Sequence, residues 1–135
     1  MPSRRRRARI IALQTLYEAD TTGHEAMGIL ERLLQDALAP EEIAEFAREL
    51  VGGATEHREY IDSVIAKVAP AWPLEQMAAV DRNILRLAIL EILLNNRTPL
   101  RAAINEAVEL AKTFGSDNSA KFVNGVLGSV SLMKG

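Results

Sequence analysis

The segment from Ile84 to Leu94 constrains the fold more than any other, because Arg86 and Glu91 are its only polar residues. A helix that is apolar almost all round has to be buried on every side by other elements. The segment is also well short of the ~20 apolar residues that a membrane-spanning helix needs. We therefore expect it to form the central helix of a globular protein.

Apolar residues recur at helical spacing through the rest of the chain, and no stretch alternates convincingly as a strand would. Gly23, Pro40 and Gly115 are stop or start signals between the periodic segments. The expected helices cover residues 4–20, 26–37, 40–68, 81–94, 99–114 and 117–130, with a short helical turn at 75–77. We predict an all-α fold with about seven helices in two packed helical subdomains.

The sequence Pro-Ala-Trp-Pro at residues 70–73 is the clearest break in the chain. We predict a single domain over residues 1–135, with an N-terminal helical half (1–69) and a C-terminal helical half (74–135) joined by residues 70–73. Asp81, Thr98 and Ser116 are the expected N-caps of the last three helices, because their side chains accept hydrogen bonds from first-turn N–H groups.

Signals for catalysis are weak. The chain has no cysteine and only two histidines, which excludes thiolate chemistry and leaves too few ligands for an ordinary zinc centre. Gly52-Gly53 lacks the Lys and Ser/Thr that follow the glycines of a phosphate-binding loop. We therefore predict that the protein is not an enzyme and has no catalytic residue, no cofactor and no metal.

The charge is distributed unevenly along the chain. The 135 residues include 16 basic and 18 acidic ones, for a formal net charge of −2. Five of the basic residues form an N-terminal arginine arm with no acid among them: Arg4, Arg5, Arg6, Arg7 and Arg9. Without these five, the chain has 11 basic and 18 acidic residues and a formal charge of −7. A basic arm on an acidic body predicts phosphate contact with a nucleic acid; the alternative is a solvated or frayed terminus.

The last expected helix offers a second candidate site. Helical spacing places Phe122 at the edge of the apolar stripe, with Asn118, Lys121 and Gly125 on the same flank. An aromatic ring beside a lysine and an amide suits stacking and phosphate contact with single-stranded RNA. The spacing is equally compatible with a core Phe122, with Asn118 as an N-cap and with Gly125 as a helix-packing position.

Four blocks of the sequence resemble the NusB family of bacterial transcription antitermination proteins, in the family's order and across essentially the whole chain. The blocks are RRRAR with ALQTLY (residues 5–9 and 12–17), VDRNILRLA (80–88), AINEAVELAK with FG (103–112 and 114–115), and KFVNGVL (121–127). The third and fourth blocks are the most specific, whereas residues 21–42 match only in helical character.

The resemblance implies a non-enzymatic RNA-binding factor with an all-α fold of two helical subdomains. Family members pair with NusE, a ribosomal small-subunit protein, bind boxA RNA, and act with RNA polymerase to suppress premature termination during ribosomal RNA synthesis. The resemblance makes six residues candidates for RNA contact: Arg5, Arg6, Arg7 and Arg9 of the arm, Lys121 and Phe122. Asn118 stands where the family often has an acid, which reduces repulsion of phosphate.

The NusE surface is expected mostly on the C-terminal half, where we take Glu75, Asp81 and Arg82 as exposed candidates for partner binding; capping and ordinary surface are the alternative. We expect a cytoplasmic protein that can form a homodimer when unpartnered. Two other hypotheses are the helical RNA-binding domain of an RNA cytosine methyltransferase and a structural adaptor that binds no RNA. The sequence shows no Gly-rich cofactor loop, which argues against the first of these.

Overall fold

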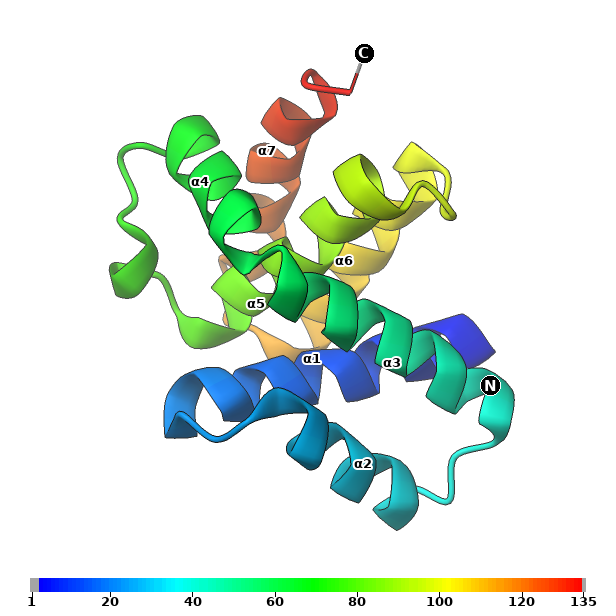
Figure 1. Cartoon of the computed structure of the whole chain (residues 1–135). Coiled ribbons are helices and arrows are strands. Elements are labelled where there is room, and N and C mark those ends of the chain that lie inside the picture. Colours follow the sequence, from blue (N-terminus) through cyan, green and yellow to red (C-terminus); the bar gives the residue numbers. More distant parts are fainter. Residues whose placement is uncertain (1–2, 135) are drawn as a thin grey trace. The chain divides into compact units, whose positions relative to one another are not determined.

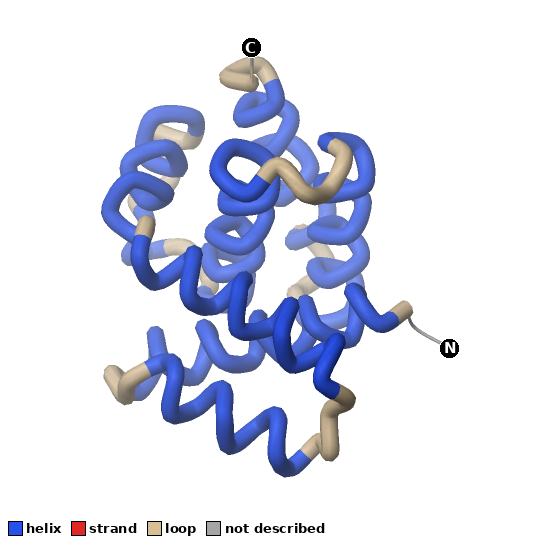
Figure 2. Tube along the Cα trace, turned by 45° about the vertical axis from the view of Figure 1, so that its right-hand side comes forward, coloured by secondary structure: helices blue, strands red, loops and turns tan. Residues whose placement is uncertain are grey.

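The computed structural model describes residues 3–134, and within them it contains seven α-helices and no strand (Figures 1 and 2). The predicted all-α fold with about seven helices is therefore confirmed. Contacts divide the chain into two units, and the division falls between Glu56 and His57. None of the helices in the described part is long and apolar enough to cross a membrane.

The first unit is a bundle in which each of three helices packs on the other two. Its helices are α1 (Arg4–Thr22), α2 (Ala26–Asp36) and α3 (Glu41–Glu56). Ser3 is the N-cap of α1, because its hydroxyl accepts a hydrogen bond from the Arg6 N–H at 3.1 Å. Gly23 ends α1 at a φ of 77°, a left-handed conformation that favours glycine.

Ion pairs tie the three helices of this unit together at its surface. Arg48 on α3 donates to both oxygens of Glu31 on α2, at 2.8 and 2.9 Å. These hydrogen bonds hold the pKa of the Glu31 carboxyl below its usual range. Arg32 on α2 binds both oxygens of Glu18 on α1, at 2.6 and 2.7 Å. Because the side chains of these ion pairs are largely exposed, the pairs orient the three helices more than they add to the free energy of unfolding.

The predicted single helix over residues 40–68 is wrong, because the helix is interrupted at His57. α3 ends at Glu56 and α4 (Arg58–Val68) follows, with His57 at φ −103° and ψ 20°. α3 packs on α1 and α2, whereas α4 packs on α5 and α7. Hydrophobic periodicity continues across His57 and does not reveal this change of partners. Residues 70–73, the predicted join between the halves, consequently lie within the second unit.

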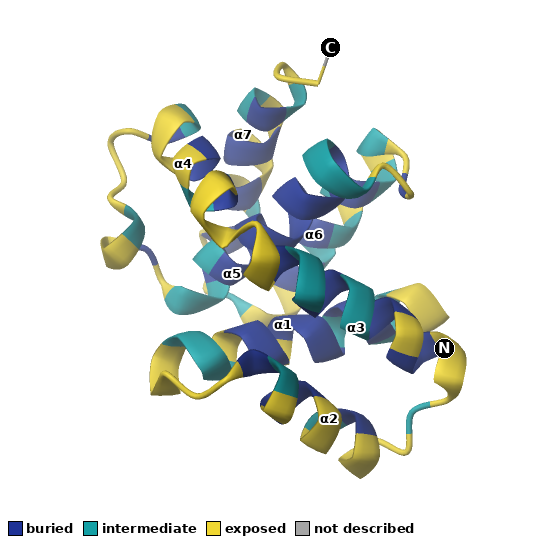
Figure 3. Cartoon of the chain, viewed as in Figure 1, coloured by how far each residue is buried: buried dark blue, intermediate teal, exposed yellow. Residues whose placement is uncertain are grey.

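The second unit is built around α5. After α4 come the 3-10 turn η1 (Leu74–Gln76), α5 (Ala79–Ile89), the π-helical continuation η2 (Leu90–Asn95), α6 (Leu100–Phe114) and α7 (Ser119–Ser131). α4, α6 and α7 all pack on α5. Every residue from 83 to 92 is buried, which confirms the expected central helix of this unit (Figure 3).

Arg86 and Glu91, two of the buried charged residues on this central helix, have hydrogen-bond partners within the second unit. Arg86 donates to both carboxylate oxygens of Asp62 on α4, at 2.8 and 3.1 Å, and to Asn83 Oδ1 at 3.0 Å. Glu91 accepts a hydrogen bond from the Thr98 hydroxyl at 2.8 Å. A buried charge without such partners would cost several kcal/mol. The pairs therefore allow a nearly all-apolar helix to carry two charges inside the protein.

The three predicted N-caps are wrong. The caps of α5, α6 and α7 are Ala78, Pro99 and Asn118, and none of them makes a side-chain capping bond. Asp81 lies inside the first turn of α5, and Thr98 binds Glu91 instead. The Ser116 N–H donates to the Ser119 hydroxyl at 2.9 Å. An N-cap at Ser116 would instead accept through its own hydroxyl from a first-turn N–H. Asp81 and Thr98 are buried, which spacing does not reveal, whereas Ser116 is exposed and bonds to the hydroxyl of the buried Ser119.

Leu38 is strained, which gives a first prediction. It has a φ of 49° just after α2, where glycine is usual, and 87% of the residue is exposed. We expect Leu38→Gly to raise the free energy of unfolding by up to about 1 kcal/mol, because the left-handed cost is removed. Urea denaturation measures this. Asn96→Gly is the control and should bring no gain, since asparagine tolerates its φ of 57° and Asn96 Oδ1 accepts from Lys134 Nζ at 3.0 Å.

The Asp62–Arg86 pair gives a second prediction. Asp62→Asn leaves the Arg86 guanidinium, only 5% exposed, without its counter-charge. We expect a loss of about 2–3 kcal/mol in the free energy of unfolding, read from the midpoint of urea denaturation. The exposed Asp36→Asn, which changes the charge equally, should cost under about 0.5 kcal/mol. Equal midpoints for the two variants would contradict the role of the buried pair.

Candidate nucleic-acid interface

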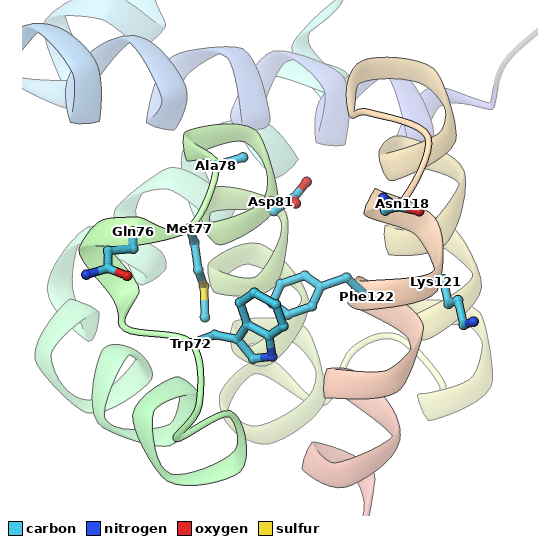
Figure 4. A pocket seen from close by; sticks show the side chains of 8 residues that line it. All are labelled: Trp72, Gln76, Met77, Ala78, Asp81, Asn118, Lys121 and Phe122. Carbon is cyan, nitrogen blue, oxygen red and sulfur yellow. The ribbon is translucent and has the colours of Figure 1, made fainter.

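A pocket of about 450 Å³ opens in the second unit between the 72–78 segment, α5 and the first turn of α7 (Figure 4). Its lining residues are Trp72, Gln76, Met77, Ala78, Asp81, Asn118, Lys121 and Phe122. Three of the four residues that the sequence analysis placed on this flank of the last helix are among them, namely Asn118, Lys121 and Phe122, whereas Gly125 is not. The pocket therefore gives these three residues a common cavity.

Two aromatic rings form one wall of the pocket. The Trp72 and Phe122 ring centroids are 5.7 Å apart and the planes meet at 73°, an edge-to-face arrangement. Phe122 is half-buried, at the edge of the α7 stripe as its spacing predicts, whereas Trp72 is 58% exposed. Exposed aromatic surface of this kind can stack with a nucleobase or with another planar group.

Lys121 and Asn118 lie at the rim and both are exposed. In Figure 4 the Lys121 ammonium extends away from the two rings, toward solvent. Asn118 occupies the N-cap position of α7 but makes no side-chain capping bond, so capping does not explain it. A Cβ added at Gly125 would meet nothing within 4 Å, and the same holds for Gly128. Helix packing therefore does not require glycine at either position.

The three predicted partner-binding residues lie in different environments. Glu75 is exposed. Asp81 is only 9% exposed, and its Oδ1 has no hydrogen-bond partner in the described part of the protein. Arg82 is half-buried and donates to the backbone carbonyls of Leu74 and Met77, at 3.3 and 3.0 Å. The expectation that all three are exposed is wrong for Asp81, which is buried beside the pocket, and for Arg82, which bonds to the loop that precedes α5.

The arginine arm forms the first turns of α1 in the other unit. Arg4 is ion-paired with Glu42, and Arg5 and Arg9 lie over the Phe46 ring of α3, at 4.4 and 5.4 Å from its centroid. Arg4 and Arg5 are exposed, Arg6 and Arg7 are half-buried, and Arg9 is only 4% exposed. The arm is thus part of a helix and not a frayed terminus, whereas the exposure of Arg4 and Arg5 fits both phosphate contact and the alternative of a solvated terminus.

This arrangement suits an anion at the start of α1. Cation–π contact with Phe46 fixes the Arg5 guanidinium while leaving it exposed. No acid lies in the first turn, so the positive end of the helix dipole adds to the charge of the arm. Arg9, an expected RNA contact, is instead buried with its guanidinium over the Phe46 ring.

Sequence reasoning missed Trp72 and Met77 in the pocket and Phe46 beneath the arm. Phe46 belongs to an ordinary apolar stripe, so no local signal marks its contact with two arginines. Trp72 did carry a signal, since a tryptophan between two prolines in a break is poorly placed for a core.

The NusB family model matches residues 6–132 of the chain. The transcription antitermination protein NusB of Chloroflexus aggregans is 54% identical over 132 residues, which cover 96% of this chain and 88% of that relative. The protein of the same name from a strain of Dehalococcoides mccartyi is 52% identical, over 97% of this chain and 92% of its own length. The chain therefore belongs to the NusB family. Its relatives are named as transcription antitermination factors and not as enzymes, which confirms the prediction that this chain is not an enzyme.

Solved NusB structures have the same fold. The T. maritima NusB structure superposes with a TM-score of 0.90 at 35% identity, covering 98% of this chain and 93% of that one. A crystal structure of the antitermination factors NusB and NusE in complex with double-stranded RNA also gives 0.90, at 28% identity and with 98% and 99% of the two chains covered. The seven helices are thus those of the NusB fold.

Contact between Phe122 and the chain's single tryptophan gives a third prediction. Phe122→Leu should shift the Trp72 fluorescence maximum to longer wavelength, because the indole loses its neighbour and becomes more hydrated. The free energy of unfolding should fall by about 1 kcal/mol. Phe114→Leu, an aromatic substitution outside the pocket, should leave the emission unchanged. An unshifted spectrum in Phe122→Leu would argue against the edge-to-face pair.

Proposed function

We propose that this protein binds boxA RNA as a heterodimer with NusE and supports ribosomal RNA transcription by suppressing premature termination. The observation that carries the proposal is the placement of Lys121, Phe122 and Asn118 around one pocket in a chain of the NusB family. A solved relative of the same fold is described in complex with NusE and RNA. Stacking on Phe122 and phosphate contact at Lys121 are the expected interactions.

The arginine arm is the proposed second RNA contact. Its charge is concentrated on one helix terminus, where Arg4 and Arg5 are exposed and Arg6 and Arg7 are half-buried. Each phosphate that an arginine neutralises releases counterions, so the arm would supply salt-dependent affinity with little sequence preference. Sequence preference would then come from the α7 pocket, where base edges can be contacted.

The acidic remainder of the chain suits a basic ribosomal-protein partner and discourages indiscriminate binding of RNA. Of the three candidate partner-binding residues, Glu75 is exposed as expected, whereas Asp81 is buried and Arg82 is half-buried. We further propose that the heterodimer works in the cytoplasm within the RNA polymerase antitermination complex. Self-association through the free partner surface would account for a homodimer in the absence of NusE.

Two other functions make different predictions. A methyltransferase RNA-binding domain would require a joined catalytic half, and the nearly full-length similarity to antitermination proteins favours the NusB role. A purely structural adaptor would bind NusE but no RNA. The exposed Arg4 and Arg5 of the arm, and separately the exposed Trp72 and Lys121 of the pocket, favour an RNA-binding protein over such an adaptor.

Salt-dependent RNA binding gives the fourth prediction. Replacing Arg5, Arg6 and Arg7 together by alanine should weaken binding of boxA RNA. The slope of log affinity against log salt concentration should become shallower by about 0.7 for each lost phosphate contact. Fluorescence anisotropy titrations at several salt concentrations, with and without NusE, measure both quantities.

A matched control removes three exposed charges outside the arm: Lys67, Arg101 and Lys112. This triple alanine variant should keep the wild-type slope. An equal loss of RNA affinity in the two triple variants would mean that the arm contributes only net charge. Wild-type affinity and salt slope in the arm variant would contradict its proposed role in RNA binding. With NusE present, wild-type protein should prefer boxA over a scrambled RNA, and equal affinity would contradict specific recognition.

A further inference from the structure

The side of α3 that meets the arginine arm carries the same kinds of group as an RNA strand. Glu42, Phe46 and Glu49 follow one another at spacings of four and three residues, which places them on one stripe of the helix. A carboxylate accepts hydrogen bonds from arginine as a phosphate does, and an aromatic ring offers a guanidinium a stacking face as a nucleobase does. Glu42 and Phe46 of this stripe both contact the arm.

Glu42 holds Arg4 in the free protein. The two side chains form an ion pair, although they are 67% and 71% exposed. Glu42 lies in the first turn of α3, where the helix dipole stabilises its negative charge. Its neighbour Glu41 pairs instead with Arg48, at 3.2 Å. Arg4 thus has an anionic partner from its own chain before any phosphate arrives.

We infer that Glu42 is an intramolecular competitor of the RNA backbone, which occupies Arg4 until a phosphate displaces it. The inference rests on the proposed RNA-binding function and adds to it a residue that weakens binding. A phosphate that reached Arg4 without displacing Glu42 would lie beside a like charge and be repelled. Both side chains of the ion pair are exposed, so the exchange needs no opening of the bundle.

Arg5 is held in a different way, which sets it apart from Arg4. Its guanidinium lies over the Phe46 ring, 4.4 Å from the centroid, and this contact orients the group without neutralising it. Arg5 can therefore take a phosphate without giving up an anion, whereas Arg4 exchanges one anion for another. Of the two exposed arginines, Arg5 should consequently contribute more to the affinity for RNA.

The competition acts on any RNA alike, because contacts to phosphate carry no information about sequence. The apparent affinity falls by the fraction of molecules in which Arg4 is free, and an exposed ion pair of ordinary strength corresponds to a factor of up to about five. Glu42 therefore reduces retention of the protein on unrelated RNA and leaves base contacts elsewhere unaffected.

The test measures binding of a fluorescein-labelled oligouridine by anisotropy. Glu42→Gln should strengthen binding about threefold at low salt, and the gain should shrink as salt screens the ion pair of the wild-type protein. The control is Glu45→Gln, an equal charge change at an exposed position on the next turn of α3. It should strengthen binding by less than about 1.5-fold, because salt screens a charge that does not contact the arm.

A double-mutant cycle with Arg4→Ala isolates the ion pair from the change in net charge. In the Arg4→Ala background, Glu42→Gln should give no more gain than Glu45→Gln, because no guanidinium is left to release. Arg4→Ala alone should weaken binding less than Arg5→Ala does. With NusE present, boxA RNA should show the same gain for Glu42→Gln as oligouridine.

The outcomes separate this inference from the function on which it rests. Weaker binding by Glu42→Gln than by wild-type protein would show that Glu42 orients the arm for RNA, and would overturn the inference. A gain equal to that of Glu45→Gln, or one that persists with Arg4→Ala, would also overturn it, since only net charge would then matter. Wild-type protein that bound neither oligouridine nor boxA RNA with NusE would overturn the proposed function itself.

Discussion

Burial of α5 on every side is the constraint on which the second unit depends. A helix with so little polar surface has to be enclosed, and α4, α6 and α7 enclose it. Arg86 and Glu91 are tolerated in its buried part because Asp62 and Thr98 bond to them from neighbouring segments. Since α7 packs on α5 and the 72–78 segment leads into it, the same helix also positions both sides of the pocket.

The sequence predicts helices well and their ends poorly, for a physical reason. Helical spacing records which residues face a core, and that spacing located α1, α2, α6 and α7 within a few residues. Helical spacing does not show which core a residue faces, so it does not predict the interruption at His57. The capping errors have a similar origin, because Thr98 and Asp81 are diverted by burial into contacts or positions that only the tertiary structure defines.

The residues of the candidate site that share one helix face could be predicted from the sequence. The residues that distant segments contribute could not. Phe122, Lys121 and Asn118 share a flank of α7, and spacing alone brings them together. Trp72 joins them from a loop that lies about fifty residues earlier, a contact no local pattern encodes. Counting arginines also overstated the accessible charge of the arm, since Arg9 is buried and Arg4 is ion-paired with Glu42.

The composition of α7 has a consequence for how binding and folding are coupled. Two glycines, three serines and three valines among its 13 residues make it a poor helix in isolation, so its helicity depends on packing of the buried stripe. A ligand on its outer surface binds only the packed form. By thermodynamic linkage, such a ligand raises the stability of the second unit as its concentration exceeds its dissociation constant. The fold thus maintains the surface that carries Lys121 and Phe122, and a ligand bound there would raise the stability of that surface further.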